Sequence, residues 1–205
     1  SWNLEQGVIV NGGAAMSVIS AKGVTVNQVG GTVFNVGAGS ASGVDLDVTG
    51  TLGHYPSIRS YGVIKTGDGV MCLSRANSYT GATVISTGTL RLGANNALPP
   101  GGTVLLAGGA LDMGAYTNTP SSLLVTNSST LLLGAGQLTF TNQTAEAWSG
   151  GRLTLAGELG STTVRFQPPL ATALRRLITY KGGSVYSTPE GYLQPVHSGM
   201  VLLMR

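Results

Sequence analysis

Residues 65–93 read KTGDGVMCLSRANSYTGATVISTGTLRLG, and this stretch decides the fold class. It holds three short β-type runs, Val70–Leu73, Thr83–Ile85 and Thr89–Leu92, separated by glycine, asparagine and serine. The run Thr89–Leu92 alternates polar and apolar residues, the pattern of a strand with one buried and one wet face. Glycine supplies the positive φ that tight turns require. The stretch therefore predicts short strands joined by tight turns.

The same pattern continues outward in both directions. Starts of successive runs lie about 7–15 residues apart, and most lie near ten. The further runs are Val24–Val26, Thr32–Val36, Val44–Val48, Val63–Lys65, Thr103–Leu106, Ala110–Met113, Ser122–Val125, Thr130–Leu133, Gln137–Phe140, Arg152–Leu155 and Thr162–Phe166.

Two all-β architectures fit this spacing, a sandwich of about 7–9 strands and a solenoid. The strands are too many and too uniformly short for a sandwich, and Asn11-Gly12 is the sole Asn-Gly hairpin signal. Thr, Val, Asn and Ser stack well between rungs, and only 9% of the residues are charged, which limits repulsion between stacked like charges. We therefore expect a solenoid with rungs of roughly 20–25 residues, or about seven or eight coils over residues 7–166.

Leu170–Tyr180 is the exception to the β pattern. Leu170, Ala173, Leu174, Leu177 and Ile178 follow the helical period, between Pro168-Pro169 and Gly182-Gly183. Because a solenoid needs its ends covered, we interpret residues 170–180 as a capping helix, with a helix packed on the flank as the alternative. The predicted division is 1–166 for the rungs and 167–205 for a capping segment with terminal strands.

The central stretch resembles the autotransporter-associated β-strand repeat, also called the passenger-associated transport repeat. Met71 stands where that pattern usually has leucine, and Arg75 stands where it usually has glycine. The resemblance implies a right-handed parallel β-helix, exported and displayed outside a bacterial cell, with no cofactor and no reaction. The matching positions are Lys65, Gly67, Gly69, Leu73, Asn77, Tyr79, Thr80, Gly81, Thr83, Gly88, Thr89, Leu90 and Gly93.

The residues of this motif are expected to have structural roles. The glycines are predicted to lie at corners between strands. The Asn77 amide is expected to form a ladder or to cap a turn. Tyr79 is expected to cover a corner with its hydroxyl in solvent.

Groups able to carry chemistry are scarce. Asp45 and Asp47 form the one close acidic pair, on one strand face. We interpret them as a solvated face, with a weak Ca²⁺ site or a glycoside-cleaving carboxylate pair as alternatives. His54 and His197 lie far apart, and Cys72 is predicted to be buried in the core. The sequence predicts no catalytic residue, no metal, no cofactor and no enzyme activity.

Charge and hydropathy argue against a nucleic-acid partner and against a membrane-spanning helix. The formal net charge is +3, from eleven Lys and Arg against eight Asp and Glu, without a basic cluster typical of a nucleic-acid binder. The longest apolar run, Met200–Met204, is far shorter than the roughly 18 residues of a membrane helix. No leader pattern follows Ser1, so we expect either a mature terminus or an arbitrary boundary there.

Three functions remain open. The first is a structural protein of the cell surface or extracellular matrix that associates with itself into filaments or layers. The second is an adhesin or glycan-binding module, and the third, remote, is a polysaccharide lyase or hydrolase that uses Asp45, Asp47 and Arg59 or Lys65. Expected partners are therefore further copies of the chain and surface glycans. The predicted self-association residues are Gly7, Val8, Ile9, Val10, Met200, Val201, Leu202, Leu203 and Met204.

Overall fold

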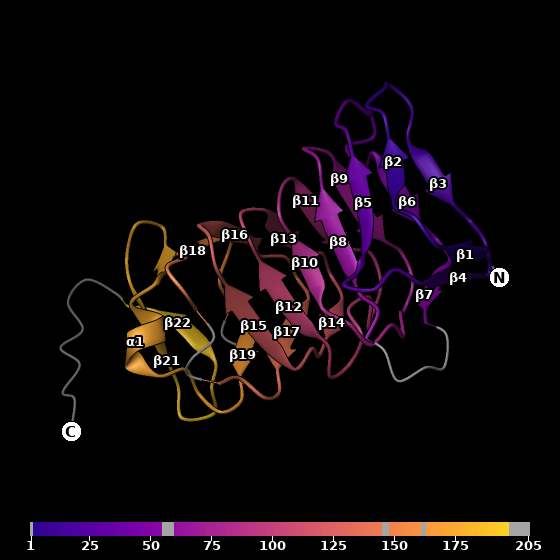
Figure 1. Ribbon diagram of the computed structural model, residues 1–205. Helices are drawn as coiled ribbons and strands as arrows, with labels where there is room; N and C mark the ends of the chain where they lie inside the picture. The colour runs from indigo at the N-terminus through magenta and orange to yellow at the C-terminus, as the bar shows by residue number, and fades with distance from the viewer. Residues whose placement is uncertain (1, 55–59, 145–147, 161–162, 197–205) are drawn as a thin grey trace.

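The computed structural model describes residues 2–54, 60–144, 148–160 and 163–196. Their strands build a parallel β-solenoid of about seven turns, which confirms the predicted fold class. Figure 1 shows the turns stacked side by side, from the indigo N-terminal strands at one end to the yellow C-terminal strands at the other. At about 4.8 Å per turn, the stack is about 34 Å long.

Each turn of the described chain adds strands to long parallel sheets. The six-stranded sheet runs in the order β15 (Ser122–Val125), β12 (Thr103–Leu106), β10 (Thr83–Ile85), β8 (Val63–Thr66), β5 (Thr32–Val36), β2 (Val8–Val10). The eight-stranded sheet runs in the order β20 (Ile178–Tyr180), β18 (Leu153–Ala156), β16 (Ser129–Leu132), β13 (Ala110–Asp112), β11 (Thr89–Leu92), β9 (Val70–Leu73), β6 (Leu46–Val48), β3 (Ser17–Ile19).

The third face is built in two parts. One sheet contains β1 (Trp2–Leu4), β4 (Gly23–Val26) and β7 (Thr51–Gly53), and the other contains β14 (Thr117–Asn118), β17 (Gln137–Phe140) and β19 (Val164–Phe166). Single backbone hydrogen bonds cross the interval between them. Ser78 N–H donates to Leu52 O, and Asn96 N–H donates to Thr117 O, at 2.9 and 3.0 Å. The stacking therefore continues through this interval without regular strands.

The register confirms the predicted rung length in the middle of the stack. Thr83 pairs with Val63 on one side and with Val104 on the other, spacings of 20 and 21 residues. The turn from Thr32 to Val63 is longer, at 31 residues.

Inward-facing side chains stack into apolar ladders. Leu46, Met71, Leu90, Leu111, Leu131 and Leu155 occupy equivalent positions on successive strands of the eight-stranded sheet, and all are buried. On the third face, the rings of Phe140 and Phe166 stack with centroids 4.8 Å apart. Each rung thus packs mainly on its two neighbours, and the core extends along the whole stack.

The C-terminal segment corrects the predicted helix over 170–180. The helix α1 spans only Thr172–Arg175, and Ile178–Tyr180 forms β20 beside β18. β-branched and aromatic residues favour a strand, and the edge of β18 offers unpaired backbone groups. A single helical turn gains little by itself. The antiparallel strands β21 (Val185–Ser187) and β22 (Leu193–Pro195) follow, and Tyr192 bridges to Arg165 of β19.

Candidate functional surfaces

Lys65 of the repeat motif lies inside the core. It follows Phe34 and precedes Ile85 in the inward-facing ladder of the six-stranded sheet, and it is fully buried. Its ammonium donates to the carbonyl oxygens of Thr66, Gly67 and Thr87, at 2.9, 2.7 and 3.3 Å. Because Thr87 belongs to the next rung, this side chain joins two rungs at one corner.

The motif glycines make room for this buried lysine and for the neighbouring rungs. Gly88 has a φ of +64°, and a Cβ there would lie 2.3 Å from Gly67 O and 2.7 Å from Lys65 Nζ. Gly67 has a φ of +74°, and its Cβ would lie 2.5 Å from Val36 O. The spacing of lysine and glycine in the repeat is therefore a packing requirement of the corner.

The position of Lys65 predicts a pH effect on stability. Burial lowers the pKa of Lys65 to about 8, against the opposing attraction of the Asp68 and Asp45 carboxylates. Between pH 8 and 10 the folded protein releases this proton while the unfolded chain, with an ordinary pKa of 10.5, keeps it. The free energy of unfolding therefore gains a contribution that rises with pH across this window. In urea unfolding at pH 7.5, 8.5 and 9.5, wild type should gain stability relative to Lys65→Met, whereas a constant difference would contradict this.

Asn77 joins three rungs through its buried amide. Its Oδ1 accepts from Leu52 N–H and its Nδ2 donates to Ala97 O, both at 2.7 Å. Asn118 repeats half of this arrangement two rungs further on, where it accepts from Leu98 N–H of the rung between them at 2.9 Å. The sequence left open a ladder or a turn cap for Asn77, and the structure shows an amide that bonds to the backbone of the rungs on both sides.

Tyr79 differs from its prediction. Its side chain is buried, and its hydroxyl is 2.7 Å from Thr83 Oγ1 rather than in solvent. Burial raises the pKa of this phenol, against the opposing effect of the Thr83 hydrogen bond. Because a corner of the third face lacks regular strands here, a large ring fills space that strand residues fill elsewhere.

Asp45 and Asp47 do not form the solvated face that their spacing suggested. Asp45 is buried, and its two oxygens accept from the backbone N–H groups of Ser40 and Val70, each at 2.8 Å. Burial opposes ionisation, yet these hydrogen bonds and the Lys65 charge leave the pKa of Asp45 lowered. Asp47 accepts from the Ser74 hydroxyl at 2.5 Å. Both carboxylates hold rungs together.

Cys72 is buried, but on the other side of its strand from the predicted core. It alternates with the core residues Met71 and Leu73, and its register partners are Asp47 and Arg91 on the outer side of the eight-stranded sheet. Its Sγ lies 3.3 Å from Ser74 Oγ. Burial raises the pKa of this thiol, with partial offset from the Ser74 hydrogen bond. The thiol therefore belongs to a covered polar row of the outer face.

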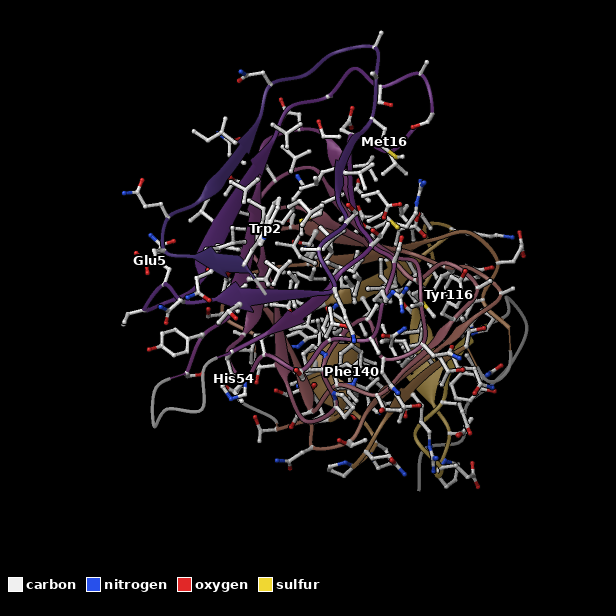
Figure 2. All side chains as sticks on the ribbon, turned by 90° about the vertical axis from the view of Figure 1, so that its right-hand side faces the viewer. Trp2, Glu5, Met16, His54, Tyr116 and Phe140 are labelled. Atoms are coloured by element: carbon white, nitrogen blue, oxygen red, sulfur yellow. The ribbon has the colours of Figure 1, made fainter. Side chains whose placement is uncertain are left out.

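The N-terminal self-association segment lies within its own solenoid. Gly7 precedes β2, and β2 pairs in parallel with β5. Val8 and Val10 face the core, whereas Ile9 points outward and is 73% exposed. In the part of the chain that the structure describes, β1, β2 and β3 each pair on one side only. Figure 2 presents this end to the viewer, with Trp2, which is 64% exposed, on it. Met200–Met204 lies outside the described residues, as do Arg59 and His197.

Over the described ranges, no three His, Cys, Asp or Glu side chains gather in a group able to hold a metal ion. His54 Nδ1 is 3.0 Å from Ser78 O. In the same ranges, no helix has the length and apolar character needed to cross a membrane.

Comparison with known proteins identifies what this architecture is similar to. The family model of the passenger-associated-transport-repeat matches residues 63–92, which confirms the resemblance of the central stretch. The adhesin BmaC autotransporter of Brucella suis biovar 1 (strain 1330) is 34% identical over 202 residues. That match covers 92% of this chain and 5% of the relative, so the chain spans about a twentieth of that protein's length. No solved structure matches the chain.

Proposed function

We propose that this chain, which carries a passenger-associated-transport repeat in a parallel β-solenoid, is a rod-like module of a surface-displayed bacterial adhesin. The supporting observation is the unbroken stacking of about seven turns around one apolar core. A stack of this kind extends in one direction and holds outward side chains at fixed spacing. The role is structural and adhesive rather than catalytic, and the adhesin relative supports it.

Surface labelling of intact bacteria tests this function. An antibody raised against the chain is expected to label unpermeabilised cells that make the whole protein, and external protease should remove the label. Deleting the residues of this chain from the whole protein is expected to reduce adherence of the cells to their target surface. Labelling that requires permeabilisation of the outer membrane would contradict the proposed location.

Self-association through the N-terminal rung is a second candidate function. The observation that favours it is the row of edges of β1, β2 and β3 that no described strand pairs with, together with exposed Ile9 on β2 and Val18 on β3. Such edges pair readily with another chain. Through them, end-to-end contacts would build filaments or layers.

Light scattering over a range of concentrations tests this candidate. We expect the average mass of the wild-type chain to rise with concentration, and Ile9→Lys/Val18→Lys to remain monomeric because edge lysines oppose pairing. Val29→Lys/Tyr116→Lys is the matched control, since both side chains are exposed and neither lies on β1, β2 or β3. A wild-type chain that stays monomeric throughout would eliminate self-association.

A further inference from the structure

A polar pocket lies on the flank of the first three rungs. Ser20, Lys22, Thr49 and Arg75 line it, and its volume is about 420 Å³. Ile19, Val48 and Leu73 are aligned neighbours on β3, β6 and β9, and the lining residues follow them in the next turns. Three successive rungs therefore bring side chains distant in sequence to one place.

Hydrogen bonds hold the pocket in place. Arg75 Nε donates to Thr49 O at 3.0 Å, and the Thr49 hydroxyl donates to Ile19 O at 3.3 Å. The guanidinium is thus tied to the neighbouring rung through one nitrogen. Its two terminal nitrogens are the ones that pair with the oxygens of a carboxylate or a sulfate.

Neither cation of this pocket forms an ion pair with a described residue. Over the ranges that the structure describes, the ion pairs are Arg91 with Asp112 and Lys181 with Glu158, and neither involves Lys22 or Arg75. Asp47 is the acid nearest in sequence to Thr49; it accepts from the Ser74 hydroxyl and is not among the residues that line the pocket. Lys22, Arg75 and Ser20 are all exposed. An anion therefore has access to two positive charges and a hydroxyl.

Arg75 is a feature of this chain rather than of the repeat framework. It occupies the position at which the repeat pattern usually has glycine, so the corner does not need its side chain for packing. Lys22 follows β3 and Arg75 follows β9, so their backbones lie two strand spacings apart along the stack. The Arg75 side chain reaches back to Thr49 O of the intervening rung, so the two charges line one pocket from different rungs. A linear polymer with charges on successive units matches such a pair better than a single small anion.

We infer that this pocket binds an anionic polysaccharide through its carboxylate or sulfate groups. The lining is polar, without aromatic or aliphatic side chains that would receive an acyl chain. Arg75 would pair with one acidic group and Lys22 with the next along the polymer, with Ser20 as a hydrogen-bond donor. The inference gives a ligand class to the adhesive role proposed above and rests on it for its biological setting.

Binding of the purified chain to immobilised polysaccharides tests this inference. The probes are a sulfated polysaccharide (heparin), a carboxylated one (polygalacturonate) and neutral dextran, with anionic phospholipid vesicles as a separate arm. We expect the wild-type chain to bind at least one of the two anionic polymers and not dextran. Lys22→Gln/Arg75→Gln should weaken that binding at least tenfold, and Arg75→Gly, which restores the residue of the repeat, should weaken it several-fold.

The matched control removes the same charge elsewhere. Arg152→Gln/Arg176→Gln changes two exposed arginines outside the pocket and should therefore leave binding within about twofold of wild type. Because the two double variants have the same net charge, a difference in binding between them reports on the pocket and not on overall charge. Circular dichroism and thermal unfolding verify that each variant is folded.

Three results would overturn the inference: no binding to either anionic polymer, equal losses in both double variants, or binding to vesicles without binding to polysaccharides. Each of these leaves surface labelling of intact cells unaffected. A failure of the pocket is therefore distinguishable from a failure of the proposed function.

Discussion

Gly88→Ala is expected to lower the free energy of unfolding by about 2–5 kcal/mol. The left-handed φ of +64° costs an alanine about 1–2 kcal/mol. The added Cβ would also lie 2.3 Å from Gly67 O and 2.6 Å from Gly69 O, both backbone atoms of the neighbouring rung. Forcing apart such packed groups costs a further 1–3 kcal/mol or so. Urea unfolding followed by circular dichroism measures the loss.

Gly101→Ala is the matched control for this change. Gly101 also has a positive φ, of +78°, but its Cβ would meet nothing within 4 Å. We expect a loss of about 1–2 kcal/mol there, from backbone strain alone. Equal losses at the two glycines would mean that the rungs do not approach each other as closely at Gly88 as described.

Asn77→Ala is expected to cost about 2–6 kcal/mol. It removes the partners of a buried N–H on Leu52 and a buried carbonyl on Ala97, and each unsatisfied buried group costs about 1–3 kcal/mol. These two groups lie on the rungs before and after Asn77. The substitution should therefore lower the cooperativity of unfolding between rungs as well as the total free energy of unfolding. Unfolding curves should therefore become broader as well as shift to lower urea.

Asn95→Ala provides the comparison for Asn77. Asn95 Oδ1 accepts from Thr117 N–H at 2.8 Å, which also joins two rungs, but this hydrogen bond is exposed to water. We expect a loss of at most about 1 kcal/mol, since water replaces the lost partner. If both asparagines gave the same small effect, the bridging role of the Asn77 amide would be wrong.

Most of the fold could be predicted from the alternation of polar and apolar residues and from the turn residues between the runs. Thr89–Leu92 and Thr103–Leu106 form strands with the predicted bounds, because alternate residues face the core and a glycine directly precedes each run. Among the strands missed, β14 (Thr117–Asn118) and β7 (Thr51–Gly53) carry little apolar signal. Their pairing depends on the register of neighbouring rungs, which one short segment does not encode.

The errors have a common physical origin in tertiary packing. The helical period over 170–180 gave way to strand pairing once β18 offered an edge for Ile178. The spacing of Asp45 and Asp47 could not reveal that the backbone N–H groups of Ser40 and Val70 donate to the Asp45 carboxylate. Lys65 was recognised as a motif residue, but its burial depends on carbonyls of its own corner and on one, Thr87 O, that the next rung supplies.

The candidate pocket could not be predicted from the sequence for the same reason. Its four residues come from turns up to 55 positions apart, and they meet only because three rungs stack in register. The one available signal was Arg75, a charged residue where the repeat pattern usually has glycine.

Distances between spin labels on the eight-stranded sheet test the stacking of the rungs most directly. In a Cys72→Ser background, labels at Thr89 and Thr154 should lie about 14 Å apart along the stack, and labels at Val70 and Thr179 about 24 Å apart, for three and five strand spacings. Pulsed and continuous-wave electron paramagnetic resonance cover this range. An increase of about 4.8 Å for each intervening strand is the predicted result. Distances that do not grow with the number of intervening strands would contradict the solenoid and everything inferred from it.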